Sequence, residues 1–185
     1  MVSWQILPFS SLTGTDIHDM YQLRSEIFVV EQQCVYLDQD GKDTAAWHVL
    51  CRSSDTRQLV AYARIMLPST GEKIVQFGRV AVAQAYRQAG LGKELLAHIM
   101  QFIHTQDLPW NVSVQIAAQA HLVHFYQSSG FHPESKVFLE DGIPHMTMTA
   151  SAHVTRYQLR SLKNVALFRP FDEQPAALRL GLNCT

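Results

Sequence analysis

Hydrophobic and polar positions alternate along the first 150 residues with the spacings of strands and helices. A β-branched, apolar run at 75–82 has the composition of a largely buried strand, and from residue 91 apolar side chains recur at helical spacing. Between the two lie a polar turn and two glycines, Gly90 and Gly92. This strand, glycine loop and helix predict a phosphate site, because the first N–H groups of a helix lack intrahelical partners and carry partial positive charge.

Further elements are predicted on both sides of this stretch. Strands are expected at 3–7, 47–51, 59–67, 112–117, 136–139 and 143–149. One helix is expected with its apolar side from Ile17 to Phe28 and with Thr13, Thr15 or Asp16 as its N-cap, and another within 120–131. The order β-α-β-β-β-α-β-α-β-β predicts an α/β (α+β) protein, in which helices flank a mixed, mostly antiparallel sheet.

Composition narrows the class of protein. A chain of 185 residues with 47% apolar and 17% charged residues is typical of a globular protein, and a net charge of −1 creates no field that attracts nucleic acid or anionic membranes. No apolar run approaches the roughly 18 residues of a membrane span, and the N-terminus lacks a signal-like core. Three cysteines without CxxC spacing favour free thiols. We therefore expect a cytoplasmic protein that binds neither nucleic acid nor membranes.

The residues around the glycines distinguish among phosphate-binding loops. Position 87 is Arg rather than Gly, and Lys93 precedes Glu94 rather than Ser or Thr, which excludes a Walker A loop. Leu95 stands where a dinucleotide-binding loop needs its third glycine. The chain instead contains Arg-x-x-Gly-x-Gly directly after a strand, at 87–92.

This motif resembles the acetyl-CoA pyrophosphate loop of the GNAT family of N-acetyltransferases. Residues 119–131 are similar to a second string of that family, Asn-x-x-Ala-x-x-x-Tyr-x-x-x-Gly-Phe, although Gln119 replaces the Asn and Leu122 the Ala. The strings LRSEIFVVEQQCVYLDQDGKD, VAYARI, GRVAV and EDGIPHMTM resemble the ElaA subfamily, over about residues 4–148. The resemblance implies a GNAT-like acyl-CoA N-acyltransferase domain at 1–150 and a C-terminal extension of unknown role at 151–185.

The resemblance also implies that acetyl-CoA is the acyl donor and indicates where it binds. The expected residues are Val80, Ala81 and Val82 in the central strand, Arg87, Gln88, Ala89, Gly90, Leu91, Gly92 and Lys93 in the loop, and Gln119, Phe125 and Tyr126 further on. Arg87 adds a cation ahead of the glycines. No metal is expected, because His121 and His124 lie one turn apart with no visible third ligand.

Acetyl transfer to an amine requires a base for the ammonium proton, donors for the oxyanion and an acid for the departing thiolate. No GxSxG, HExxH or cysteine beside an obvious base is present, so direct transfer in a ternary complex is expected. Tyr126 is the candidate general acid, because a phenol with a pKa of about 10 is protonated at neutral pH. The candidate bases are Glu31, Asp38, Asp40, His48 and His145.

The acceptor site is expected near an acidic stretch, Glu31 to Asp43, and the closing hairpin that carries Glu140 and Asp141. The stretch is open to three interpretations: a solvated acidic turn, a calcium loop that lacks the EF-hand Gly and Glu, or an acidic wall that binds a cationic amine. The candidate acceptor contacts are Glu31, Tyr36, Asp40 and His145, whereas Arg24 and Arg79 are expected to pair with acidic neighbours.

Three functional hypotheses remain open. The first is an acetyl-CoA-dependent N-acetyltransferase that acts on a primary, cationic amine. The second is an acyl-CoA-binding or sensing module without turnover, against which the tyrosine at 126 argues, because a sensor needs no acid for a thiolate. The third is an enzyme like the acyl-homoserine-lactone synthases, which share an LRxxIF string followed by an acidic loop. Whether the acceptor is a small molecule or a protein is open, and so is homodimer formation through an amphipathic segment at 154–168.

Overall fold

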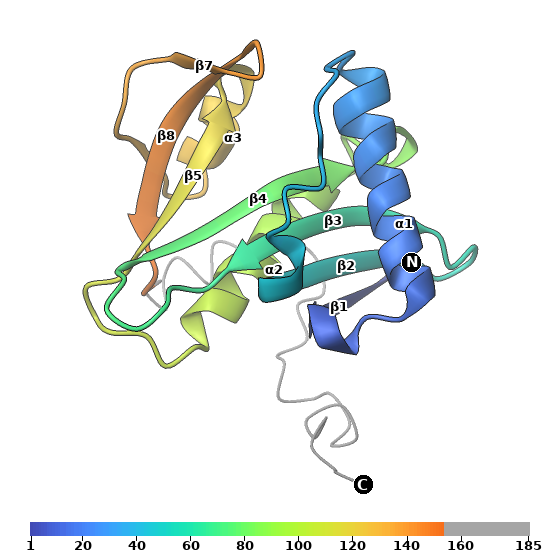
Figure 1. Cartoon of the computed structure of the whole chain (residues 1–185), viewed down its shortest axis with the longest axis horizontal. Helices are drawn as coiled ribbons and strands as arrows, with labels where there is room; N and C mark the ends of the chain where they lie inside the picture. Colours follow the sequence, from blue (N-terminus) through green and yellow to red (C-terminus); the bar gives the residue numbers. More distant parts are fainter. Residues whose placement is uncertain (154–185) are drawn as a thin grey trace, which may run out of the picture.

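The computed structural model describes residues 1–153 and confirms the predicted class, a mixed sheet with flanking helices (Figure 1). Residues 154–185, which are most of the extension predicted at 151–185 and include its amphipathic segment, lie outside the described residues. The elements in chain order are β1 (Val2–Pro8), α1 (Gly14–Arg24), η2 (Ser25–Glu31), β2 (Trp47–Ser53), β3 (Leu59–Met66), β4 (Ile74–Val82), α2 (Leu91–His104), β5 (Ser113–Gln119), α3 (Val123–Gln127), β6 (His132–Pro133), β7 (Phe138–Glu140) and β8 (Ile143–Ser151). Short helical turns at Phe9–Ser11, Asp43–Ala45, Gln84–Tyr86 and Ala120–Leu122 connect them. The two-residue strand β6 was not predicted.

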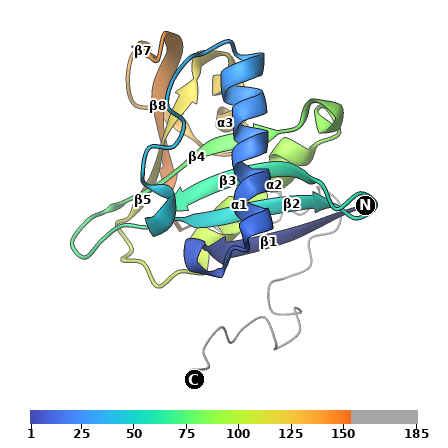
Figure 2. The ribbon, with the colours of Figure 1, turned by 45° about the vertical axis from the view of Figure 1, so that its right-hand side comes forward.

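The strands form one sheet in the order β1-β2-β3-β4-β5-β8-β6, and β7 pairs with β8. Helix α1 covers one face of the sheet and α2 the other (Figures 1 and 2). Alternate residues of β2 show the two faces: Val49 and Cys51 pack in the cluster that contains α2, whereas Leu50 packs with α1. Among residues 1–153, no helix combines the length and the apolar character needed to cross a membrane.

Strands β4 and β5 separate along their length. They are the parallel neighbours of the sheet and pair only from Ile74–Gln76 to Ser113–Gln115. Beyond this short ladder the two strands diverge, so that the sheet opens toward their carboxyl ends (Figure 1). Backbone groups on the facing edges are therefore free of each other where the strands have separated.

A β-bulge in β4 faces this opening. Arg64 of β3 pairs with Gly78, but Tyr62 pairs with Ala81, which leaves one residue of β3 opposite two residues of β4. Arg79, in the bulge, has φ +52°, a conformation that an L residue seldom adopts. The bulge re-aims the side chain of Arg79 and interrupts the hydrogen-bond ladder beside the opening.

The helix predicted from Ile17 to Phe28 is continuous but changes type. Of the three candidate N-caps, Thr13 is the one observed, because its side chain accepts from the Asp16 N–H while the Asp16 carboxylate accepts from the Thr13 N–H. Beyond Arg24 the chain continues as η2, which has π-helical hydrogen bonding. Such π-turns are rare and occur often at functional sites.

Candidate active site

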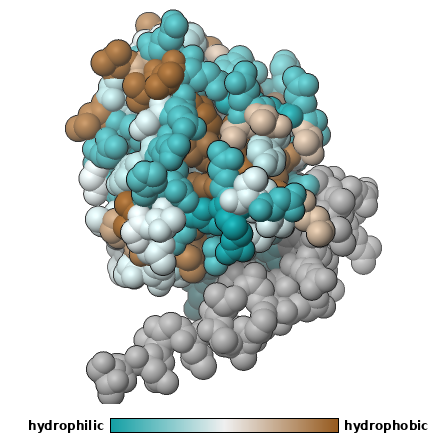
Figure 3. Space-filling model, turned by 90° about the vertical axis from the view of Figure 1, so that its right-hand side faces the viewer, coloured by the Kyte–Doolittle hydropathy of each residue, from teal (hydrophilic) through white to brown (hydrophobic). Residues whose placement is uncertain are grey.

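Two adjoining cavities lie at the opening between β4 and β5. The larger has a volume of about 770 Å³ and the smaller about 560 Å³. Residues that line both include Tyr36, Arg79, Glu140 and Asp141, so the two cavities meet between the segment after η2, the bulge of β4 and the β7–β8 hairpin. Figure 3 shows hydrophobic side chains at the upper left of one face of the molecule, and others among hydrophilic ones farther down.

The larger cavity brings together most of the predicted donor-binding residues. It is lined by Val80, Val82, Arg87, Gln88, Gly90, Gly92, Lys93, Gln119, Phe125 and Tyr126. Ala81, Ala89 and Leu91 do not line either cavity. Two of these side chains point into the hydrophobic core instead: Ala81 packs in the cluster that contains α1, and Leu91 packs in the cluster that contains the other residues of α2.

The glycine loop leaves N–H groups available at the start of α2. Gly90 is the N-cap and has φ +86°, which favours glycine at that position. The first backbone bonds into this turn are donated by the N–H groups of Lys93 and Glu94 to the Gly90 carbonyl. The N–H groups of Leu91 and Gly92 therefore remain for an anion in the cavity. A Cβ at Gly92 would lie 3.8 Å from the Phe125 ring, an ordinary contact.

The guanidinium of Arg87 is hydrogen-bonded to two other residues of the protein. Its Nε donates to the Val82 carbonyl at 2.9 Å, and Nη1 and Nη2 donate to the two carboxylate oxygens of Glu31 at 2.7 and 2.8 Å. These hydrogen bonds from Arg87 hold the pKa of Glu31 below its usual range. A carboxylate stabilised in its charged form is a weaker proton acceptor, so the structure argues against Glu31 as the general base.

The carboxylates of the acidic stretch are paired with arginines. Asp38 is 2% exposed and accepts from Arg24 Nε and Arg79 Nε, each at 2.8 Å, and from the Tyr36 hydroxyl at 2.9 Å. The expectation that Arg24 and Arg79 pair with acidic neighbours is confirmed. Asp38 is therefore a structural anion and cannot act as the base in the cavity.

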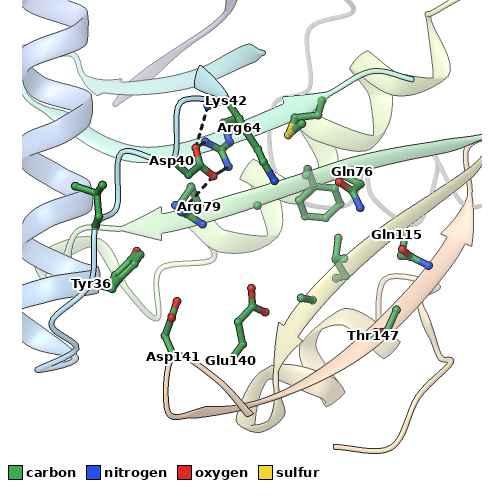
Figure 4. A pocket seen from close by; sticks show the side chains of 16 residues that line it. Tyr36, Asp40, Lys42, Arg64, Gln76, Arg79, Gln115, Glu140, Asp141 and Thr147 are labelled. Carbon is green, nitrogen blue, oxygen red and sulfur yellow. Dashed lines mark hydrogen bonds and ion pairs between the residues drawn. The ribbon is translucent and has the colours of Figure 1, made fainter. Parts of the chain in front are cut away.

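Asp40 and Asp43 are neutralised in the same way. Arg64 of β3 donates to both oxygens of Asp40, at 2.6 and 2.7 Å (Figure 4). It also donates to Asp43 at 2.9 Å. Hydrogen bonds from Arg64 lower the pKa of Asp40. Asp43 also accepts from Arg24 at 2.8 Å. Asp40 lines the smaller cavity, as a residue that contacts the acceptor should. Its charge is already paired with Arg64, however, which argues against the predicted roles of Asp40 as general base and as the anion that binds a cationic acceptor.

His48 is excluded as a base by its burial. It is fully buried and lines neither cavity. One ring nitrogen lies 2.8 Å from the Tyr62 hydroxyl, and the other lies 2.9 Å from the Asp43 carbonyl oxygen. Burial lowers its pKa. The ring is therefore a hydrogen-bonding member of the buried network rather than a group in reach of an acceptor.

Tyr126, the candidate general acid, is a buried residue on the wall of the larger cavity. The residue is 6% exposed, lines the larger cavity and packs against the rings of Phe77, Phe125 and Phe131. Burial raises the pKa of its hydroxyl to about 12. Within residues 1–153 no group hydrogen-bonds to this hydroxyl, which leaves its proton available to the cavity.

His145 lies across the same cavity, on β8. It stands directly opposite Gln119 of β5 in the antiparallel register. Its Nδ1 lies 2.8 Å from the Ile143 carbonyl oxygen, and because a carbonyl only accepts, Nδ1 carries the proton in the neutral ring. Nε2 then keeps its lone pair, so the ring can accept a proton there.

The closing hairpin, with the carboxylates of Glu140 and Asp141, was expected beside the acceptor site. Both line the two cavities, and Figure 4 shows them on the hairpin side, opposite Arg79 and Tyr36. In the part of the chain that the structure describes, neither is paired with a cation. The same part holds no group of three or more His, Cys, Asp or Glu side chains arranged to bind a metal.

Comparisons with known proteins identify the family and the fold. The family model described as "Acetyltransferase (GNAT) domain" matches residues 30–152. The protein ElaA of Escherichia coli is 41% identical over 152 residues, which cover 80% of this chain and 95% of that protein. Its crystal structure superposes with a TM-score of 0.73 at 39% identity, covering 82% of this chain and 100% of that one.

Two further solved structures share the fold. An acyl-CoA N-acyltransferase from Pseudomonas aeruginosa has a TM-score of 0.74 at 36% identity and covers 82% of this chain and 100% of its own. A CoA-dependent acyl-homoserine lactone synthase has a TM-score of 0.69 at 16% identity, with 89% of each chain covered, and this likeness concerns the fold alone.

Proposed function

The chain belongs to the GNAT acetyltransferase family, whose members use acyl-CoA as a substrate, and we propose that this protein transfers an acetyl group from acetyl-CoA to a primary, cationic amine. The observation that carries the proposal is the larger cavity. It has a glycine-rich helix N-terminus at one place on its wall and a buried, protonated Tyr126 at another. The proposed setting is the cytoplasm, with a small-molecule amine as the acceptor.

The donor would be held mainly by backbone groups. The N–H groups at Leu91 and Gly92, with those of the loop before them, suit a pyrophosphate. The interrupted ladder at Gly78 to Val82 offers backbone N–H groups to an amide-containing arm and to the thioester carbonyl. Gly92 is open enough for close approach, since a Cβ there would meet only the Phe125 ring.

The proposed chemistry uses two titratable side chains of the cavity wall, Tyr126 and His145. The neutral amine nitrogen attacks the thioester carbonyl carbon, and the carbon–sulfur bond breaks as the amide bond forms. The proton lost by the amine goes to His145 Nε2, directly or through a water molecule, and the thiolate takes the proton of the Tyr126 hydroxyl. No covalent enzyme intermediate is needed, because both substrates meet at the junction of the cavities.

The acceptor is proposed to enter through the smaller cavity. Glu140 and Asp141 supply the negative charge there, since Asp40 is paired with Arg64. Tyr36 lies at the junction of the cavities, with its hydroxyl bonded to Asp38. Leu37, 76% exposed, also lines this cavity and offers apolar surface to the rest of the acceptor. A cationic amine with an apolar portion fits these walls.

The test is a screen of amines with acetyl-CoA, with free thiol as the readout. Polyamines, lysine-like amines and arylalkylamines are compared with amines that carry a net negative charge. Thiol release with cationic amines, absent without protein, is the expected result. Binding of CoA without turnover of any amine would favour the sensing module, and failure to bind CoA would overturn the assignment of the cavity.

A further inference from the structure

Glu31 accepts hydrogen bonds from both terminal nitrogens, Nη1 and Nη2, of the Arg87 guanidinium. Two parallel hydrogen bonds of 2.7 and 2.8 Å join the two nitrogens to the two carboxylate oxygens. The third nitrogen, Nε, is bonded to the Val82 carbonyl, so the guanidinium is also anchored to the end of β4. A guanidinium presents this fork to one planar or tetrahedral anion at a time.

Arg87 is also the cation at the head of the glycine loop, in the larger cavity. If acyl-CoA binds there as proposed above, its pyrophosphate is a second anion that competes with Glu31 for the Arg87 guanidinium. Because Nε is tied to Val82, the fork cannot turn to a second anion while it still holds Glu31. The pyrophosphate and the carboxylate therefore cannot both bind the fork.

We propose that Glu31 and the pyrophosphate of acyl-CoA exchange on Arg87, so that Glu31 sets the affinity of the protein for its acyl donor. The inference rests on the proposed function. It replaces the role of general base predicted for Glu31, and it explains why an acidic side chain at the end of η2 reaches a cation 56 residues further along the chain.

The exchange is feasible because the pair is accessible. The side chains of Arg87 and Glu31 are 37% and 40% exposed. Pairs of this kind contribute little to stability, so an incoming dianion can replace the carboxylate. Glu31 thus lowers donor affinity by a modest factor instead of blocking the site.

The experiment measures the dissociation constant of CoA by calorimetry for wild type, Glu31→Gln and a control, Glu26→Gln. Glu26 lies in the same η2 segment, and its carboxylate bonds Gln22 rather than an arginine, so the control matches the change in net charge. Glu31→Gln is expected to bind CoA about two- to fivefold more tightly than wild type, while Glu26→Gln binds as wild type does.

A double variant isolates the exchange. In an Arg87→Gln background CoA binding is weaker, and adding Glu31→Gln should no longer tighten it, because the contested cation is gone. Unchanged or weaker CoA binding by the single variant Glu31→Gln would overturn the exchange and make Glu31 a residue that orients Arg87. If wild type itself does not bind CoA, the failure lies in the proposed function instead.

Discussion

Arg24 and Asp38 form a buried ion pair, with Arg24 Nε 2.8 Å from Asp38 Oδ2 and side-chain exposures of 0% and 2%. The pair connects the end of α1 to the segment that lines both cavities. Asp38 in turn bonds Arg79 and Tyr36, which stand where the cavities meet. The acceptor wall is thus held in place by buried charges whose own function is structural.

Removal of one partner of this pair should destabilise the fold. Asp38→Asn leaves the buried guanidinium of Arg24 without its full counter-charge, and we expect a loss of about 3–5 kcal/mol in the free energy of unfolding. Urea denaturation followed by circular dichroism measures it. Asp55→Asn, in the exposed β2–β3 turn, is the matched control and should change stability by less than about 0.5 kcal/mol. A similar small loss for Asp38→Asn would contradict the structural role of the pair.

The glycine loop provides a second test, in which Gly92→Val is the informative variant. A Cβ added at Gly92 meets only the Phe125 ring, at an ordinary contact distance of 3.8 Å, so the fold should tolerate the substitution. It would nevertheless block the approach of a phosphate to the N–H groups, and the dissociation constant of CoA should rise at least tenfold, or about 1.4 kcal/mol. Gly90→Val is less useful, because φ +86° there would strain any β-branched residue. Normal CoA affinity in a folded Gly92→Val protein would refute the phosphate site.

Tyr126→Phe tests the proton donor. The substitution keeps the ring and its aromatic contacts, so CoA affinity should stay near wild type while turnover falls on the order of 10²-fold. Tyr86→Phe, outside both cavities, is the matched control and should retain full turnover.

The pH profile adds an independent check on this residue. Because burial raises the pKa of Tyr126 to about 12, the phenol stays protonated as the pH rises past its ordinary range. Turnover with saturating amine should therefore not fall between about pH 8 and pH 10. A decline in wild-type turnover centred near pH 9 would point to another acid.

Substitution of Glu140 and Asp141 tests the acceptor wall. The double variant Glu140→Gln/Asp141→Asn removes the two unpaired carboxylates, and the KM for a cationic amine should rise about fivefold while CoA affinity is unchanged. Glu72→Gln, in the β3–β4 turn, is the control for loss of surface charge. If the double variant uses cationic amines as well as wild type does, these carboxylates only solvate the hairpin.

Much of the site was determined by local sequence. The apolar run of β4, the helical spacing of α2 and the glycines between them depend on neighbours within a few residues, and the structure places them as predicted. The spacing of Tyr126 to Gly130 and Phe131 likewise lies within one helix and its end. Local periodicity and turn chemistry act over such distances, so a single sequence can show them.

Only the tertiary structure shows which cations pair with the carboxylates of the acidic stretch. Asp38 and Asp40 meet Arg79 and Arg64, which are 41 and 24 residues away, and Glu31 meets Arg87 across 56 residues. A sequence shows four carboxylates close together, but only the fold shows which guanidinium neutralises each one. Tertiary structure also distinguishes His48 from His145 as candidate base. The two residues are of the same type, but His48 is fully buried, whereas His145 lines the larger cavity. The cavity itself forms where β4 and β5 stop pairing. The register of two strands depends on both of them together, so the sequence of either strand alone does not show this point.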